Sequence, residues 1–270
     1  MIELSKRGWR TIKRYKLLDI VGFILVIAGI FWIILRGAEN QGYFWQWFRV
    51  PRYLYSFKND EFTAGPILQG LKITLNITWI SLILTYIIGL IIALLRLSDS
   101  LAARIVSRVY MEAARNTPLL VQLYFIYFVI APILNIQRFT AAVLALSLFE
   151  GAYASEIYRA GIVSIHKGQW EAAYSLGLST YNTYRRIILP QAIRRILPPL
   201  TSQAISLIKD SSLVSVLAVY EMTMQANAVV AETFLVFEIY FTIAAIYLIM
   251  TVTLSQIVNL MERRFKAYYT

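Results

Sequence analysis

Six long apolar runs constrain this chain more than any other feature of its sequence. A helix needs about 20 predominantly apolar residues to cross the roughly 30 Å hydrocarbon core of a bilayer. Each run is near that length, and the third run is short and contains Pro132. The sequence therefore predicts an all-α integral membrane protein. The expected spans are Leu17–Leu35, Ile67–Leu95, Leu119–Leu134, Phe139–Ile162, Ile196–Val219 and Phe237–Leu260.

Composition supports a membrane protein and excludes several kinds of site. The 270 residues are 59% hydrophobic and 15% charged, with a mean hydropathy of +0.60. Soluble domains carry about 25% charged residues. The chain has no cysteine, so a disulfide framework, a thiolate nucleophile and a cysteine-ligated metal are excluded. His166 is the single histidine, which excludes a histidine cluster, and we interpret it as a solvated loop residue.

The first apolar run is open to two interpretations. It follows a basic N-terminal segment, Met1–Lys16, as the core of a signal peptide would. However, the run is longer than a usual signal core, and Arg36–Glu39 is a poor cleavage site. We therefore expect a retained first span. The next stretch, Arg36–Pro66, is rich in Trp, Tyr and Phe, which favour the membrane interface. We expect it to lie along the outer surface as a loop with an interfacial helix.

The basic residues predict the orientation of the spans. Loops on the cytoplasmic side carry an excess of Lys and Arg. Basic residues are concentrated before the first span, in alternate loops and in the tail, and this bias places both termini in the cytoplasm. It also accounts for the net charge of +11 without nucleic acid. The residues assigned to the inner side are Lys6, Arg7, Arg10, Lys13, Arg14, Lys16, Arg96, Arg104, Arg108, Arg115, Arg159, Lys167, Arg185, Arg186, Arg194, Arg195, Arg263, Arg264 and Lys266. Those assigned to the outer side are Arg36, Arg49, Arg52, Lys58 and Arg138.

The polar stretch from Glu171 to Pro190 predicts two short helices with a break between them. Gly177 supplies the permissive backbone of a helix end, and Ser179 is a plausible N-cap for the second helix. Pro190 is expected to end or kink that helix. The spacing predicts one apolar face for it, and nothing else in the loop is expected to cover that face. Its members are Tyr181, Tyr184, Ile187 and Ile188. Such a surface either docks on a partner or lies on the membrane.

This stretch resembles the EAA signature of the membrane subunits of ABC importers, and the chain as a whole is similar to the polar amino acid permease family. The resemblance runs from about Gly70 to Arg264. Asn116 and Ser211 stand where the family usually has glycine and threonine. The similar elements are Gly70–Leu75, Arg115–Gln122, Gly151–Ile162, Gly168–Ala192 and Lys209–Leu213.

The resemblance implies a fold and a division of the chain. The fold is a five-helix type I ABC importer permease core plus one additional N-terminal transmembrane helix. Residues 1–66 then hold the cytoplasmic basic N-terminus, the extra helix and the external aromatic segment. Residues 67–264 form the transmembrane domain, with a cytoplasmic coupling loop at about 164–195.

The resemblance also implies the partners and the energy source. The chain has no GxxxxGK[ST] loop to hold ATP phosphates, so it is expected to be no enzyme and to bind no cofactor. ATP and Mg are expected on two partner ATPase subunits that contact the coupling loop. The other expected partners are a second permease subunit and an extracytoplasmic amino acid binding protein, with no nucleic acid. The location is the bacterial plasma (inner) membrane. The expected coupling residues are Glu171, Ala172, Ala173, Gly177, Ile187, Leu189 and Pro190.

Charged groups inside the predicted spans are candidates for the substrate path. A charge at the centre of a span costs roughly 2.5–3.5 kcal/mol, so it usually faces a cavity or a partner. For Glu156, Lys209 and Asp210 we favour structural ion pairs that hold helices together over a role in the substrate path, because these residues belong to the elements that resemble the family. For Glu150, the counter-cation is either a cationic amino acid substrate or Lys209. The candidates are Glu150, Glu156, Lys209, Asp210 and Gln122.

The sequence therefore predicts the permease subunit of an ATP-driven importer of polar amino acids, with cationic ones considered. The alternative is a secondary transporter or a channel, which would have no use for an EAA loop. A membrane-embedded enzyme is a third possibility, against which the absence of cysteine and of a histidine cluster argues.

Overall fold

The computed structural model describes residues 2–40, 42–58 and 61–267, although the side chains of 2–17, 38, 58 and 261–267 are outside the description. The chain divides into two compact units, Met1–Trp47 and Phe48–Thr270. The division at residue 66 that the sequence suggests on functional grounds remains a prediction. The orientation of the termini also remains a prediction, because it depends partly on basic side chains that are not described.

The first unit consists mainly of α1 (Ile2–Asn40), and it contains the predicted first span. Leu18–Gly37 is long and apolar enough to cross a membrane, and none of it is buried within the protein. Phe23 and Leu25, for example, are 68% and 66% exposed. An apolar helix with side chains exposed all round is stable in lipid and unfavourable in water.

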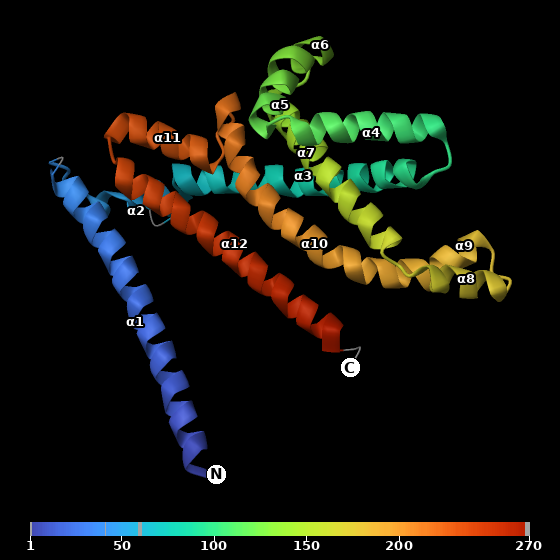
Figure 1. Ribbon diagram of the computed structural model, residues 1–270. Coiled ribbons are helices and arrows are strands. Elements are labelled where there is room, and N and C mark those ends of the chain that lie inside the picture. Colours follow the sequence, from blue (N-terminus) through green and yellow to red (C-terminus); the bar gives the residue numbers. More distant parts are fainter. Residues whose placement is uncertain (1, 41, 59–60, 268–270) are drawn as a thin grey trace. The chain divides into compact units, whose positions relative to one another are not determined.

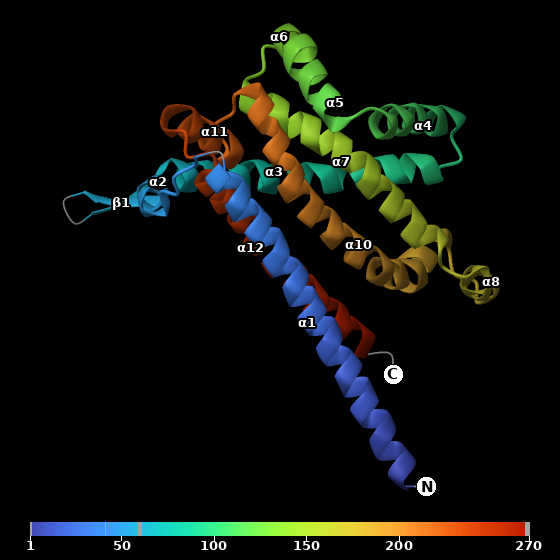
Figure 2. The same ribbon diagram turned by 60° about the vertical axis from the view of Figure 1, so that its left-hand side comes forward.

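The second unit begins with an aromatic β-hairpin, where the sequence predicted a loop with an interfacial helix. After a short 3₁₀ turn, η1 (Trp47–Arg49), and a single helical turn, α2 (Pro51–Leu54), the strands β1 (Tyr55–Lys58) and β2 (Glu61–Ala64) pair antiparallel. The register places Phe57 opposite Phe62, and the centroids of these two rings lie 6.1 Å apart. The Tyr55 ring lies 6.0 Å from the Phe57 ring on the same strand. Such cross-strand aromatic pairs stabilise a hairpin. Figure 2 shows the hairpin extending beyond the start of α3.

The remainder of the second unit is helical, and each predicted span falls on a helix or a helical series. Only the last two residues of Ile196–Val219 lie outside a helix. Figure 1 shows α4 running alongside α3 and the long α10 and α12 at an angle to them. The elements are α3 (Pro66–Leu97), α4 (Leu101–Asn116), α5 (Leu119–Phe125), η2 (Ile126–Ile130), α6 (Ala131–Leu134), α7 (Arg138–Val163), α8 (Lys167–Ser175), α9 (Thr180–Thr183), η3 (Tyr184–Ile188), α10 (Leu189–Asp210), η4 (Ser211–Leu217), α11 (Met222–Thr233) and α12 (Val236–Ala267).

Hydropathy alone identifies fewer spans than the six that we predicted. In the described chain, three helices are long and apolar enough to cross a membrane: Leu18–Gly37, Pro66–Leu97 and Val236–Leu260. Two more spans result if bent pairs count as one span each. These pairs are Leu101–Asn116 with Leu119–Leu134, bent by 111°, and Thr180–Leu217 with Met222–Thr233, bent by 50°. The helix α7 is not among them.

The helix α7 lies at the centre of the second unit, which explains its modest hydropathy. It contacts α3, α4, α5 and α10, and most of its middle is buried. A helix that is enclosed by other helices does not need large apolar side chains on every face. Instead, α7 is rich in the small residues Ala, Ser and Gly, which allow neighbouring helices to approach closely in a membrane.

The contact between α3 and α7 is the most extensive between any two described helices. Gly89 of α3 makes this approach possible, because a Cβ atom there would lie 2.7 Å from the Cβ of Ala154. On the partner helix, a Cβ at Gly151 would lie 2.9 Å from a methyl group of Ile88. The buried polar side chains of α3 are Thr74, Thr78, Ser81 and Thr85.

Two prolines are accommodated by wide π turns that precede them. The turn η2 closes with a bond from Ala131 N–H to the Ile126 carbonyl, one residue before Pro132. Likewise, η3 closes with a bond from Leu189 N–H to the Tyr184 carbonyl, one residue before Pro190. A proline ring clashes with the carbonyl four residues earlier in a regular α-helix, and the wider turn relieves this clash. The helix therefore continues through Pro190 instead of ending there.

We expect Gly89→Ala to destabilise the protein, because the new methyl group would overlap Ala154 on α7. Overpacking of this kind costs roughly 1–3 kcal/mol, so the thermal midpoint of the detergent-solubilised protein should fall. Gly29→Ala is the control, since a Cβ at that position meets nothing within 4 Å. Adding Ala154→Gly to Gly89→Ala should restore part of the loss. An unchanged midpoint for Gly89→Ala would contradict the close approach of the two helices.

Candidate functional site

The predicted coupling loop forms a helix–turn–helix between α7 and α10. Its first helix, α8, begins at His166, whose Nδ1 accepts a hydrogen bond of 3.1 Å from the backbone N–H of Gly168. The single histidine is exposed and caps this helix. Glu171 and Ala172 are exposed on α8, whereas Ala173 is only 2% exposed. One side of α8 therefore packs on the protein and the other faces solvent.

Gly177 ends α8 as the sequence predicted. Its φ of +73° lies in the left-handed region, which favours glycine. Two bonds complete the C-terminal cap: Gly177 N–H to the Tyr174 carbonyl at 2.9 Å, and Leu178 N–H to the Ala173 carbonyl at 3.1 Å. This pattern is a Schellman motif. Ser179 then caps α9 by accepting a 3.4 Å hydrogen bond from Asn182 N–H.

The second half of the loop buries much of the face that we expected to be uncovered. Ile188 is fully buried in a cluster with Ile165 and Ala192, and the Tyr184 ring meets Trp170 edge-on at 5.0 Å. Ile187 is half-buried, and Leu189 is 39% exposed beside the exposed Pro190. Burial raises the pKa of the Tyr184 hydroxyl above its ordinary value.

Tyr181 does not belong to this buried face, contrary to the sequence pattern. It is 68% exposed, whereas Thr183 is buried. The π turn η3 changes the angle between successive side chains, so the regular helical spacing used for the prediction does not apply. The large apolar groups left exposed on the loop are Tyr174 at 48%, Leu176 at 80% and Tyr181 at 68%.

Three of the predicted substrate-path residues meet where α7 crosses α10. Glu150 of α7 is 1% exposed and accepts a hydrogen bond from the side-chain amide of Gln203 on α10. Asp210 and Lys209, at the end of α10, lie close enough to interact electrostatically with the Glu150 carboxyl group. Lys209 is itself exposed and is absent from the ion pairs of the described chain. The sequence did not single out Gln203, which is the direct neutral partner of Glu150.

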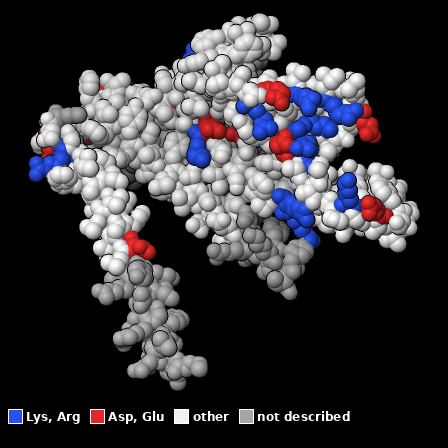
Figure 3. Space-filling model, in the orientation of Figure 1, with Lys and Arg blue, Asp and Glu red and all other residues white. Residues whose placement is uncertain are grey.

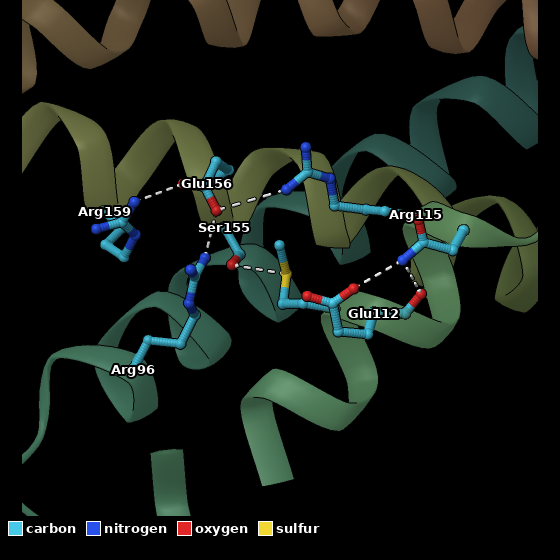
Figure 4. A network of polar contacts seen from close by, with 8 residues as sticks. Arg96, Glu112, Arg115, Ser155, Glu156 and Arg159 are labelled. Carbon is cyan, nitrogen blue, oxygen red and sulfur yellow. Dashed lines mark hydrogen bonds and ion pairs between the residues drawn. The ribbon is translucent and has the colours of Figure 1, made fainter. Parts of the chain in front are cut away.

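Glu156 lies in a different environment, one and a half turns further along α7. Its carboxylate is paired with the guanidinium groups of Arg96 and Arg159, the latter at 2.6 Å, and lies 3.8 Å from Arg115 (Figure 4). The pairing joins α3, α4 and α7 at one point. Such ion pairs between helices are what a structural role for Glu156 requires.

Gln122 lies on α5, and its side chain reaches back to the turn between α4 and α5. Its side-chain amide donates to the Ala114 carbonyl at 2.7 Å, and to the carbonyl and hydroxyl oxygens of Thr117 at 3.1 and 2.8 Å. These bonds satisfy carbonyl groups at the end of α4. The amide therefore holds the 111° bend between the two helices in shape.

Sequence reasoning missed two fully buried carboxylates, Glu221 and Glu238, and the hydrogen bonds of Glu221 define its role. Glu221 caps α11 by accepting hydrogen bonds from the backbone N–H groups of Thr223 at 2.9 Å and Met224 at 2.8 Å. The hydroxyl groups of Tyr247 and Thr74 donate to it at 3.2 and 3.3 Å. Four donors satisfy the group, so Glu221 links α3, α11 and α12. The available signal was its place before a short helix, a position where acceptor side chains are favoured.

A metal centre is not indicated in the part of the chain that the structure describes. Within residues 2–40, 42–58 and 61–267, no three His, Asp or Glu side chains lie close enough together to hold a metal ion.

Comparison with known proteins identifies a family that covers most of the second unit. Residues 85–267 match the family described as binding-protein-dependent transport system inner membrane component. The glutamine transport system permease protein GlnP of Escherichia coli (strain K12) is 43% identical over 203 residues, which are 74% of this chain and 93% of the relative. The L-cystine transport system permease protein TcyB of Bacillus subtilis (strain 168) is 44% identical over 207 residues, 75% and 88% of the two chains.

Solved structures agree with the sequence relatives. A chain of an amino acid ABC transporter crystallised with histidines has a TM-score of 0.70 and 41% identity, and the match covers 74% of this chain and 94% of that one. An inward-facing MetNI methionine ABC transporter chain matches with a TM-score of 0.61 at 18% identity, over 73% and 95% of the two chains. The second likeness concerns the fold alone.

We expect Glu156→Gln to destabilise the second unit, because it leaves Arg96 and Arg159 without their counter-charge. These side chains are 24–33% exposed, so the loss should be roughly 1–3 kcal/mol, below that of a fully buried pair. Thermal unfolding in detergent would measure it. Glu112→Gln is the control, since the Glu112 carboxylate bonds to Asn116 and not to an arginine. If Arg96→Gln costs as much stability in the Glu156→Gln background as in the unmodified protein, the two residues are not coupled.

Proposed function

Because the chain belongs to the family of binding-protein-dependent transport system inner membrane components, we propose that it imports polar amino acids as the permease subunit of an ATP-driven ABC importer. The observation that carries this proposal is the identity of 43–44% with permease subunits over about three quarters of the chain. Family membership argues against the alternative of a secondary transporter or channel. Members of the family are membrane subunits, not catalysts.

We infer that the loop from α8 to η3 is the contact for the ATPase subunits, which would carry ATP and Mg. The predicted coupling residues are Glu171, Ala172, Ala173, Gly177, Ile187, Leu189 and Pro190. Exposed Tyr174, Leu176 and Tyr181 supply an apolar surface that a partner could bury. Ile188 and Ala192 fix the other side of the loop to the helices. This division between an exposed tip and an anchored base supports the transfer of movement from a partner to α10.

The other partners in the proposal are a second permease subunit and an extracytoplasmic amino acid binding protein. The name of the family supports the binding protein, and the number of permease subunits is our inference from the resemblance. The concentration of basic residues near the coupling loop supports a cytoplasmic position for that loop and for both termini. The protein would then lie in the inner membrane with its aromatic hairpin outside.

The nature of the substrate follows from the relatives and from Glu150. Relatives transport glutamine or L-cystine, and the matching structure contains histidines. A polar amino acid is therefore the proposed substrate class. Glu150 is 1% exposed and lies near a second carboxyl group, that of Asp210, while its hydrogen-bond donor is the neutral amide of Gln203. A cationic amino acid would supply the positive charge that these carboxyl groups lack, which supports a preference for cationic substrates.

For the coupling role, we expect Leu176→Glu to weaken association with the ATPase by at least about tenfold, as for a central residue of an interface. Leu176 is 80% exposed, so the change should leave folding intact. Co-purification of the ATPase subunit and substrate-stimulated hydrolysis would be measured together. Leu176→Met is the matched control and should behave as the unmodified protein. Unimpaired co-purification and hydrolysis with Leu176→Glu would refute a docking role for this surface.

For the substrate role, we expect Glu150→Gln to lower the uptake of arginine, lysine and histidine about tenfold more than the uptake of glutamine. The reason is that a cationic side chain would lose its carboxylate partner. Basal ATP hydrolysis should persist, since the introduced amide retains a polar contact for Gln203. Competition uptake assays in vesicles would measure the difference. Equal losses for all substrates, together with a lower thermal midpoint, would assign Glu150 a purely structural role.

A further inference from the structure

An arginine-lined cavity lies between the end of α3, the helix α4 and the end of α7. Its volume is about 750 Å³, which is the size of a site for a small organic molecule. The charged residues on its wall are Arg96, Arg104, Arg108, Glu112, Arg115 and Arg159. Nothing in the proposed transport function uses this cavity. Figure 3 shows a blue patch over α4 with acidic groups at its border.

The charges in the cavity do not balance. Glu156 pairs with Arg96 and Arg159 and lies 3.8 Å from Arg115. In the described part of the chain, no carboxylate comes within 4 Å of Arg104 or Arg108. Arg115 therefore shares the Glu156 carboxylate with two other arginines, and Arg104 and Arg108 have no carboxylate partner among the described residues.

Glu112, the acidic residue on the wall, reduces this imbalance without removing it, because Glu112 and Glu156 together stand against five arginines. The Glu112 carboxylate accepts a 2.8 Å hydrogen bond from the side-chain amide of Asn116. Arg104 donates only a 3.4 Å hydrogen bond to the Asp99 carbonyl, and Arg115 lies over the Tyr153 ring at 5.5 Å. Guanidinium groups are always protonated, so the excess positive charge persists at every physiological pH.

The position of the cavity indicates an anion at the membrane surface. Arg96 is in the last turn of α3, Leu101 is the first residue of α4, and Arg159 lies one turn before the end of α7. The ends of membrane helices lie at the level of the lipid headgroups. Apolar side chains stand beside the arginines, since Leu101 is 68% and Ile105 53% exposed. A ligand with a phosphate group and an apolar chain fits this site, because the phosphate can meet the arginines while the chain covers the exposed apolar side chains.

We propose that this cavity binds a phosphate group, and that its source is the headgroup of an anionic phospholipid. The planar guanidinium fork matches the oxygen atoms of a phosphate, and arginines spaced four residues apart on α4 present two forks on one side. Basic pockets between membrane helices bind acidic lipid headgroups for this reason. A bound lipid would hold α4 against α3 and α7 at the point where Arg96, Arg115 and Glu156 meet.

The experiment compares lipid retention by two double variants with the same change in charge. Arg104→Gln/Arg108→Gln removes two cavity arginines, whereas Lys72→Gln/Arg138→Gln removes two exposed cations that do not line the cavity. Each protein is reconstituted with equal parts phosphatidylcholine, phosphatidylglycerol and cardiolipin, re-extracted in detergent and analysed for bound lipid. The cavity variant should retain roughly 30-fold less anionic lipid, at about fivefold per cation, and the control should retain the normal amount. Equal retention by both variants would overturn the proposal.

A second arm distinguishes a lipid from free phosphate. Thermal unfolding in a neutral detergent is followed with added inorganic phosphate or with short-chain phosphatidylglycerol. Stabilisation by the lipid alone assigns the phosphate to a lipid, and stabilisation by inorganic phosphate alone supports a phosphate site supplied from solution. In either case the effect should be absent from Arg104→Gln/Arg108→Gln. Stabilisation by glutamine or histidine, with neither phosphate nor lipid active, would assign the cavity to the carboxylate of a substrate and overturn the proposal.

A conservative variant keeps the test decisive if the double variant does not fold. Arg108→Lys preserves the charge but removes the fork, and Arg108 makes no contact that folding requires among the described residues. Anionic lipid retention should fall about threefold to fivefold, with phosphatidylcholine retention unchanged. Loss of subunit assembly without any loss of retained lipid would show that the arginines contact a protein partner, which would also overturn the proposal.

Discussion

The close packing of α3 on α7 is the contact on which the rest of the second unit depends. Glycine at position 89 brings the two backbones together, because a methyl group there would meet Ala154 at 2.7 Å. In lipid, helices associate through such close contact and not through the removal of apolar surface from water. Once α7 is enclosed by α3, α4, α5 and α10, it is shielded from lipid over most of its length. A shielded helix is the place where a membrane protein can carry acidic side chains.

The two acidic residues of α7 are stabilised by different means. Glu156, near the end of the helix, is surrounded by three guanidinium groups and remains partly exposed. Glu150, at its middle, is almost fully buried beside a neutral amide and a second carboxyl group. The first arrangement locks three helices together by charge. The second leaves a buried acid without a basic side chain in contact, which is costly unless the site is protonated or receives a cation.

Much of this structure follows from the sequence, and its exceptions have physical causes. Apolar runs were enough to locate α3 and α12, and Gly177 and Ser179 were enough to place the break in the loop. The hairpin was missed because aromatic content was interpreted without the alternation that pairs Phe57 with Phe62. Tyr181 was placed on the wrong face because a π turn has a different spacing from an α-helix. The pairing of Arg96 with Glu156 joins residues on different helices, and no local pattern reports such a contact.

The passage of the helix through Pro190 has a mechanical consequence. From Thr180 to Leu217 the backbone is helical without interruption, over about 55 Å at 1.5 Å per residue, and Pro198 and Pro199 lie inside this stretch. Had Pro190 ended the helix, a loose joint would have separated the loop from α10. The wide turn before Pro190 instead lets a movement of the loop pass into α10. The two later prolines interrupt the backbone hydrogen bonds, so they are the points at which this helix can bend before it reaches Lys209 and Asp210.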